Sequence, residues 1–209
     1  MFLAAAAIGI CLLVTVPLAM RARHTFPALN ERSAAAWHSY GGEWNLADDV
    51  YSNRADGRGD KLVGGPASLG DYAVSSLLRF DTAPGDPSFG DAGILLRVLD
   101  PAIGVDAHRG YYAALRPDDH ALLIGSMNFY FRELATTPFP HELHSGRWYR
   151  LTFTARACTF FLHAEDTETH EMAELSYVER DCSPRRGQIG LRSYYAKASW
   201  RDLQVTSLP

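Results

Sequence analysis

Residues 71–80 read DYAVSSLLRF, and their side chains fall into two alternating sets. One set is Tyr72, Val74, Ser76, Leu78 and Phe80, and the other is Ala73, Ser75, Leu77 and Arg79. Successive side chains of a β-strand point to opposite faces, so this period of two predicts a strand that presents two different faces.

Similar short runs, rich in Tyr, Phe, Val, Leu and Thr, continue from Trp37 to the C-terminus and are separated by Gly, Pro, Asp and Asn clusters. The other expected strands are 50–54, 92–99, 110–116, 121–125, 128–134 (NFYFREL), 147–156, 159–164, 187–195 and 198–206. No segment shows ten or more residues of helical periodicity. The sequence therefore predicts an all-β fold, a sandwich of two antiparallel sheets.

Composition narrows the possible partners. The chain has 209 residues, of which 47% are hydrophobic and 21% charged, as expected for one globular domain. Its formal net charge is -4, and acidic and basic residues are interspersed. A basic face that would neutralise a phosphate backbone is missing from this pattern, so we expect no nucleic-acid partner.

The N-terminus has a different character. Residues 2–20, FLAAAAIGICLLVTVPLAM, carry no charge and are long enough to approach the thickness of a bilayer as a hydrophobic helix. We expect residues 1–22 to be a signal peptide or membrane anchor, 23–36 a linker, and 37–209 the sandwich. Arginines follow the apolar run and none precedes it, which for an anchor would favour a cytoplasmic domain.

We nevertheless expect the domain to lie outside the cytoplasm, as a secreted, periplasmic or membrane-anchored protein, because of its chemistry. Cys11 lies in the apolar run, which leaves Cys158 and Cys182 as an even pair in the folded part. Both are expected at loop ends, where they either form a disulfide or remain two free thiols. A buried N-terminal helix is the alternative to a targeting segment.

The order of the segments carries a family resemblance. YGGEWNLADDVYSNRADGRGDKLV, DYAVSSLLRF, GDAGILLRV, GYYAAL, GRWYRLTFTA and GQIGLRSYYAKASWRDLQV resemble, across residues 37–209, the concanavalin-A-like lectin/glucanase superfamily. The most similar members are the 3-keto-disaccharide hydrolase domains, often labelled family-sixteen glycoside hydrolases, and laminin-G-like modules. The resemblance implies a jelly-roll sandwich with one concave sheet that binds glycans, so carbohydrate is the expected partner.

Sugar sites combine aromatic rings with planar or charged hydrogen-bonding groups. By the resemblance, Arg97 faces the concave side beside Tyr111 or Tyr112. The alternative is a buried ion pair of Arg97 with Asp91 or Asp100 that holds the sheets together.

Arg192 and Tyr194 share one face of a strand and form a second candidate pair for ligand contact. The alternative for this pair is a solvent-facing role on an edge strand.

Catalysis has weaker support. Glucanases of this superfamily place paired carboxylates on one strand, and this sequence lacks that strand. Its densest acidic cluster is Glu165, Asp166, Glu168 and Glu171, in a stretch that reads as a solvated hairpin loop. We therefore predict no catalytic residues and lean against an enzyme; a glycoside hydrolase-like activity is the alternative.

Asp48, Asp49 and Asp202 are candidate ligands of a structural calcium ion, because calcium prefers oxygen ligands. No other cofactor is expected. Three functions stay open: an exported or membrane-tethered carbohydrate-binding module, a hydrolase acting on a disaccharide or polysaccharide, and a structural or protein-interaction sandwich.

Overall fold

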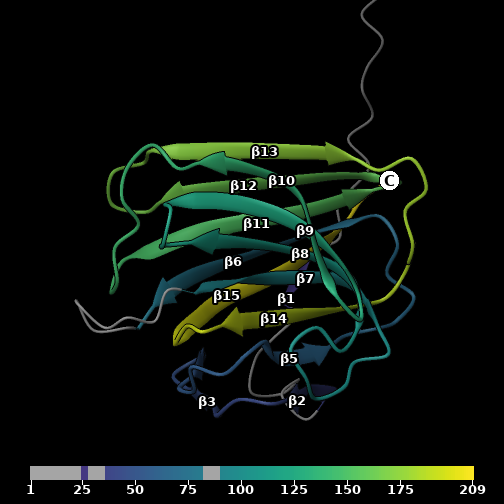
Figure 1. Ribbon diagram of the computed structural model, residues 1–209, viewed down its shortest axis with the longest axis horizontal. Coiled ribbons are helices and arrows are strands. Elements are labelled where there is room, and N and C mark those ends of the chain that lie inside the picture. Colours follow the sequence, from purple (N-terminus) through teal and green to yellow (C-terminus); the bar gives the residue numbers. More distant parts are fainter. Residues whose placement is uncertain (1–24, 28–35, 82–89) are drawn as a thin grey trace, which may run out of the picture.

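The computed structural model describes residues 25–27, 36–81 and 90–209. Within them the chain forms two antiparallel sheets, one of eight strands and one of seven, and contains no α-helix (Figure 1). Among these residues no helix is long and apolar enough to cross a membrane. The expected N-terminal hydrophobic helix lies outside the described residues.

The eight-stranded sheet has the order β13 (Met172–Val178), β12 (Thr159–Asp166), β11 (Trp148–Arg156), β6 (Tyr72–Phe80), β15 (Ala198–Ser207), β4 (Val50–Asn53) and β3 (Trp44–Ala47). One further strand, β1 (Thr25–Pro27), pairs with β15. The segment predicted as a linker thus contributes a short strand to this sheet.

The seven-stranded sheet has the order β10 (Phe131–Pro138), β9 (Ala121–Asn128), β8 (Arg109–Arg116), β7 (Asp91–Leu99), β14 (Gln188–Tyr194), β5 (Asp60–Gly64) and β2 (His38–Tyr40). Strand β14 is an interior strand of this sheet, because it lies between β7 and β5. The alternative that placed Arg192 on an edge strand is therefore wrong.

The main hydrophobic core fills the space between the sheets. Alternate residues of β6, β11 and β12 face residues of β7, β8 and β9 there, as the period of two requires. The largest fully buried apolar side chains in this layer are Trp200, Tyr72, Tyr111, Tyr149, Phe80, Phe153 and Phe160.

The seven-stranded sheet is also covered on its outer face. A second cluster of buried side chains lies there: Val63, Leu95, Val98, Tyr112, Ala114, Leu123 and Met127. The β7–β8 loop, residues 100–108, is held against this face, because Lys61 Nζ donates to the carbonyl of Gly104 and Arg192 Nη2 donates to that of Val105. Consequently β7 and β8 are buried along nearly their whole length.

A β-bulge interrupts β7 at Arg97. The pairing of β7 with β8 shifts between Leu96 and Leu99, and Arg97 has a φ of 54°. Its amide donates to the Tyr72 hydroxyl at 2.7 Å. The bulge therefore breaks the alternation of side chains from this point onward.

Three parts of the strand assignment differ from the sequence prediction. The segment 128–134, predicted as one strand, contains the turn of the β9–β10 hairpin at Phe129 and Tyr130. Strand β13 directly follows the predicted polar loop of residues 163–171, and no strand was predicted there. The short strands β2, β3 and β5 were not predicted, because they are three to five residues long.

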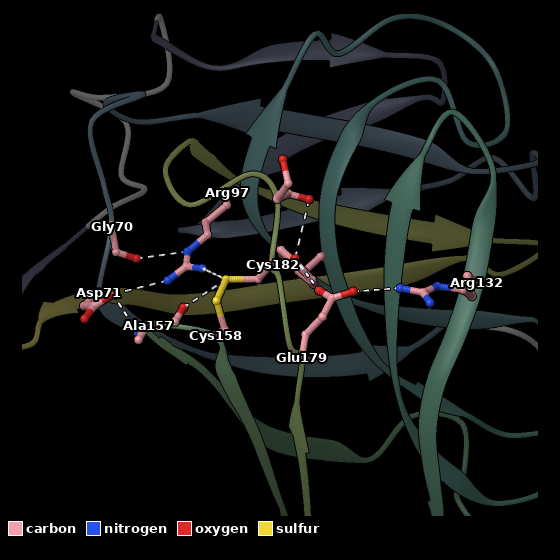
Figure 2. Close-up of a disulfide and its surroundings, with 10 residues drawn as sticks. Gly70, Asp71, Arg97, Arg132, Ala157, Cys158, Glu179 and Cys182 are labelled. Carbon is pink, nitrogen blue, oxygen red and sulfur yellow. Dashed lines mark hydrogen bonds and ion pairs between the residues drawn. A yellow bond between two sulfur atoms is a disulfide. The ribbon is translucent and has the colours of Figure 1, made fainter.

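Cys158 and Cys182 form a disulfide (Figure 2). Cys158 is in the turn before β12, and Cys182 is in the loop of residues 179–187 between β13 and β14. Glu179 of this loop accepts a hydrogen bond from the Tyr111 hydroxyl of β8 and forms an ion pair with Arg132 of β10. The disulfide thus fixes a loop that connects the two sheets.

Replacing both cysteines, in Cys158→Ser/Cys182→Ser, is expected to lower the free energy of unfolding by about 3 kcal/mol, because the bond closes a loop of 24 residues. Urea unfolding of the oxidised protein and the double variant measures this loss. Peptide mapping after alkylation without reductant should find Cys158 and Cys182 unmodified. Two alkylated thiols would contradict the pairing.

Candidate functional site

A pocket of about 360 Å³ opens on the outer face of the seven-stranded sheet. Strands β7, β8, β10 and β14 contribute to its walls, together with the β7–β8 loop. Its lining residues are Arg58, Gly90, Asp91, Val105, Asp106, Arg116, Asp118, Phe131, Arg192 and Tyr194. The mixture of guanidinium, carboxylate and aromatic groups is typical of a polar ligand site.

Arg192 is the central polar group of this pocket. Its side chain is only 4% exposed, and its Nη1 lies 3.4 Å from Asp91 Oδ1 while its Nη2 lies 3.3 Å from Asp106 Oδ1. One guanidinium therefore connects a strand carboxylate with a loop carboxylate. Because a buried charge needs partners, this arrangement gives both Nη atoms of Arg192 a carboxylate and fixes the two acids, while the buried Nε has no hydrogen-bond partner among the described residues.

Two tyrosine rings enclose the same guanidinium. The Arg192 Cζ lies 4.6 Å from the centroid of the Tyr112 ring and 5.4 Å from that of the Tyr194 ring. Such cation–π contacts are strongest where water is excluded, as it is beside the fully buried Tyr112. The structure thus brings together three of the predicted ligand residues, Tyr112, Arg192 and Tyr194.

Asp91 shares its carboxylate between two partners. The Tyr112 hydroxyl donates to Asp91 Oδ1 at 2.6 Å, on the same oxygen that Arg192 approaches. Burial raises the pKa of Asp91, although Arg192 and the Tyr112 hydroxyl both lower it. Burial likewise raises the pKa of Tyr112, so its hydroxyl stays a proton donor.

Arg116 and Phe131 also line the pocket. Arg116 binds Asp119 and Glu133, which orient its guanidinium. The Phe131 ring lies on Gly125 of β9, where a Cβ would come within 2.1 Å of the ring. Any side chain at position 125 would therefore displace the ring from its place beside the pocket.

Two more bases are buried beneath the loop that bounds the pocket. Burial lowers the pKa of Lys61 to about 8, and Arg192 contributes to the same shift. Burial, Lys61 and Arg192 together lower the pKa of His108 to about 3. His108 is therefore neutral at physiological pH, and the outer face avoids a third buried positive charge.

Arg97 does not lie in this pocket. It is 1% exposed, and it donates to Gly70 O, to Asp71 Oδ1 and to Cys182 Sγ, beside the disulfide (Figure 2). Its ion-pair partner is Asp71 rather than Asp91 or Asp100, because the bulge turns its side chain away from the outer face. Of the two expected neighbours of Arg97, Tyr111 is close enough for the guanidinium to oppose the rise that burial causes in its pKa, whereas Tyr112 lies beside Arg192.

Tyr111 also points elsewhere. Its ring is in the core between the sheets, stacked on Phe160 with 4.0 Å between the centroids, and its hydroxyl donates to Glu179. Neighbouring residues of a strand face opposite sides, so Tyr111 and Tyr112 cannot both line one face. Tyr111 therefore has a packing role.

The candidate calcium ligands do not form a metal site. Within residues 36–81 and 90–209, no group of three or more His, Cys, Asp or Glu side chains is placed to hold a metal ion. Asp48, Asp49 and Asp202 are exposed and have φ values of 52°, 58° and 55°. Short acidic side chains tolerate such turn and bulge positions.

The acidic cluster 165–171 forms the end of the β12–β13 hairpin, as predicted, but it is not fully solvated. Asp166 is buried and accepts from Arg147, His141 and the amides of Glu168 and Thr169. Burial alone would raise its pKa, but these donors outweigh burial and lower the pKa to about 2. The cluster thus acts as a structural anchor for the hairpin.

Several pocket residues were not among the predicted ligand residues. Asp106 and Asp118 are in loops, where periodicity gives no signal. Phe131 was assigned to a strand that lacked the hairpin turn. Asp91 was considered only as a partner of Arg97. Its position at the start of a buried strand could have indicated a site residue, because a carboxylate there needs a partner.

Known structures share this architecture. The exoplasmic/lumenal domain of VIP36 in its Ca2+/Man3GlcNAc-bound form matches with a TM-score of 0.64 and 11% identity, covering 89% of each chain. Winged bean acidic lectin complexed with methyl-α-D-galactose matches with a TM-score of 0.63 and 9% identity over 88% of this chain and 97% of that one.

A Bacillus subtilis protein of unknown function with a galectin-like fold matches with a TM-score of 0.62 and 12% identity over 89% of this chain and 96% of that one. No protein-family model matches the sequence, and no curated protein is significantly similar to it. The chain therefore has the concanavalin-A-like lectin fold, as the resemblance implied.

The Asp166→Asn variant tests the hairpin anchor. The folded pKa of about 2 lies below the usual 3.8, so ionised Asp166 stabilises the fold above pH 4, and this stability is lost as the pH falls toward 2. The variant should be less stable at pH 7 and should lose less stability between pH 4 and 2. Urea midpoints across this range measure the difference, with the exposed Glu174→Gln as control. Parallel curves for Asp166→Asn and wild type would rule out this role.

Proposed function

We propose that the protein is a carbohydrate-binding module whose glycan occupies the pocket around Arg192. The observation that carries this proposal is the Arg192 guanidinium, held between Asp91 and Asp106 and flanked by the Tyr194 ring at the pocket surface. A planar guanidinium and fixed carboxylates suit vicinal hydroxyls, and an aromatic ring suits the apolar face of a pyranose.

The charge of the lining favours a neutral sugar. Three arginines, Arg58, Arg116 and Arg192, are matched by three aspartates, Asp91, Asp106 and Asp118. A uronic acid or sulfated sugar would meet as many carboxylates as guanidinium groups, so it gains little from its charge. The solved lectins of the same fold, bound to mannose- or galactose-containing ligands, are consistent with this choice.

A location outside the cytoplasm is the second part of the proposal. The apolar residues 2–20 support export or a membrane tether, and the Cys158–Cys182 disulfide supports an oxidising compartment. The oxidation state of these cysteines in protein isolated from its own cells tests this part. A reduced pair would argue for the cytoplasm.

Glycoside hydrolysis is the second candidate function. Asp91 and Asp106 face one pocket, and the raised pKa of Asp91 suits a general acid. Release of reducing ends from the glycans that bind, lost in Asp91→Asn, would favour this candidate. Binding without turnover would favour the module.

Substitutions in the pocket test glycan binding. An array of immobilised glycans identifies a ligand, and titration calorimetry then measures its Kd. Arg192→Lys keeps the charge but loses the planar fork, so we expect affinity to fall roughly tenfold or more. Tyr194→Ala removes a stacking ring and should weaken binding roughly two- to tenfold.

The matched control is Thr154→Ala, which alters a hollow of about 430 Å³ on the outer face of the eight-stranded sheet. This variant should bind like the wild type. The three variants should all retain cooperative unfolding. Equal affinities in all of them would place the glycan elsewhere.

A further inference from the structure

An exposed apolar rim extends from the pocket across the β7–β8 loop and the β9–β10 turn. We define it by five residues, Ile103, Val105, Phe129, Tyr130 and Phe131, whose exposed fractions range from 36% to 79%. Phe129 and Tyr130 are each 57% exposed. Large apolar side chains gathered in this way on a protein surface mark a binding surface more often than scattered ones do.

The rim is continuous with the pocket and fixed to it. Val105 and Phe131 belong to both, since they line the pocket wall. The amide of Phe131 donates to Asp106 Oδ2 at 3.1 Å, and the amide of Phe129 donates to the carbonyl of His108 at 3.0 Å. The hairpin turn therefore rests on the same loop that supplies Asp106 to Arg192.

The backbone of the turn is unfavourable for the residue it carries. Phe129 has a φ of 59°, in the left-handed region that short hairpin turns usually fill with Gly, Asn or Asp. A bulky aromatic residue there is a genuine outlier. Strained backbone of this kind gathers at ligand sites, so the strain directs attention to what the exposed ring contacts.

We propose that the rim is a second subsite, which binds the next sugar units of an oligosaccharide whose terminal unit occupies the pocket. This inference rests on the proposed function. The charged groups that select hydroxyls are all in the pocket, whereas the rim offers only aromatic and aliphatic surface. Such surface suits the C–H faces of further pyranose rings, which stack without needing specific hydrogen bonds. The ligand is therefore an oligosaccharide rather than a monosaccharide.

The test compares chain lengths of one sugar. Mannose, mannobiose and mannotriose, and the equivalent series of any sugar retained on the array, are titrated into the full-length protein. Wild type should bind the trisaccharide roughly two- to tenfold more tightly than the monosaccharide. The Phe129→Ser/Tyr130→Ser variant should lose this gain while its monosaccharide affinity stays unchanged.

Two further variants make the readout specific. Phe161→Ser removes an aromatic side chain of similar exposure from the outer face of the eight-stranded sheet and should keep the gain. Phe129→Trp should change its fluorescence with the trisaccharide and not with the monosaccharide.

The outcomes separate the two proposals. If the wild type binds no glycan in any series, the proposed function fails and the subsite fails with it. If glycans bind in the pocket but the gain with length is equal in wild type and the serine variant, the subsite alone is wrong. Sedimentation that shows a dimer for wild type and a monomer for the serine variant would instead assign the rim to a second copy of the chain.

Discussion

Burial of the seven-stranded sheet on both faces is the constraint on which the rest of the structure depends. One face meets the eight-stranded sheet, and the other is closed by the loop of residues 100–108. Polar side chains on that outer face lose water and must find partners in the protein. Lys61 finds the carbonyls of Gly59 and Gly104, and Arg192 finds two carboxylates. The pocket forms where this layer of buried charged side chains reaches the surface at Arg192.

The same burial makes the stability of the fold depend on pH. The pKa of His108 falls from 6.5 to about 3 in the folded protein, so the unfolded chain takes up a proton first as the pH drops. The free energy of unfolding therefore decreases below pH 6.5 because of His108, and it continues to decrease toward pH 3. The raised pKa of Asp91 acts in the opposite direction, since its protonated form is the one that burial favours. On lowering the pH, His108 beneath the loop thus decreases the stability of the fold, whereas Asp91 in the pocket increases it.

Much of the fold could be predicted from the sequence, because β6, β11 and β12 alternate over eight or nine residues. Strand β13 could not, since it alternates only between exposed and half-buried side chains. The candidate site was predicted in part. Arg192 and Tyr194 follow from strand alternation, and Tyr112 was one of two alternatives that the family resemblance implied. The bulge at Arg97 moves that side chain to another environment, and alternation cannot reveal a bulge. Asp106 comes from a loop, so only the folded chain brings it to Arg192.

The contact between Gly125 and Phe131 has a consequence for how this site can change in evolution. The ring occupies the space that a Cβ at position 125 would need, and the two residues lie on adjacent strands six positions apart in the chain. A substitution at either position alone leaves a hole or a clash beside the pocket. A side chain at position 125 is therefore compatible with this packing only together with a smaller residue at position 131, so the two positions are expected to change as a pair in evolution.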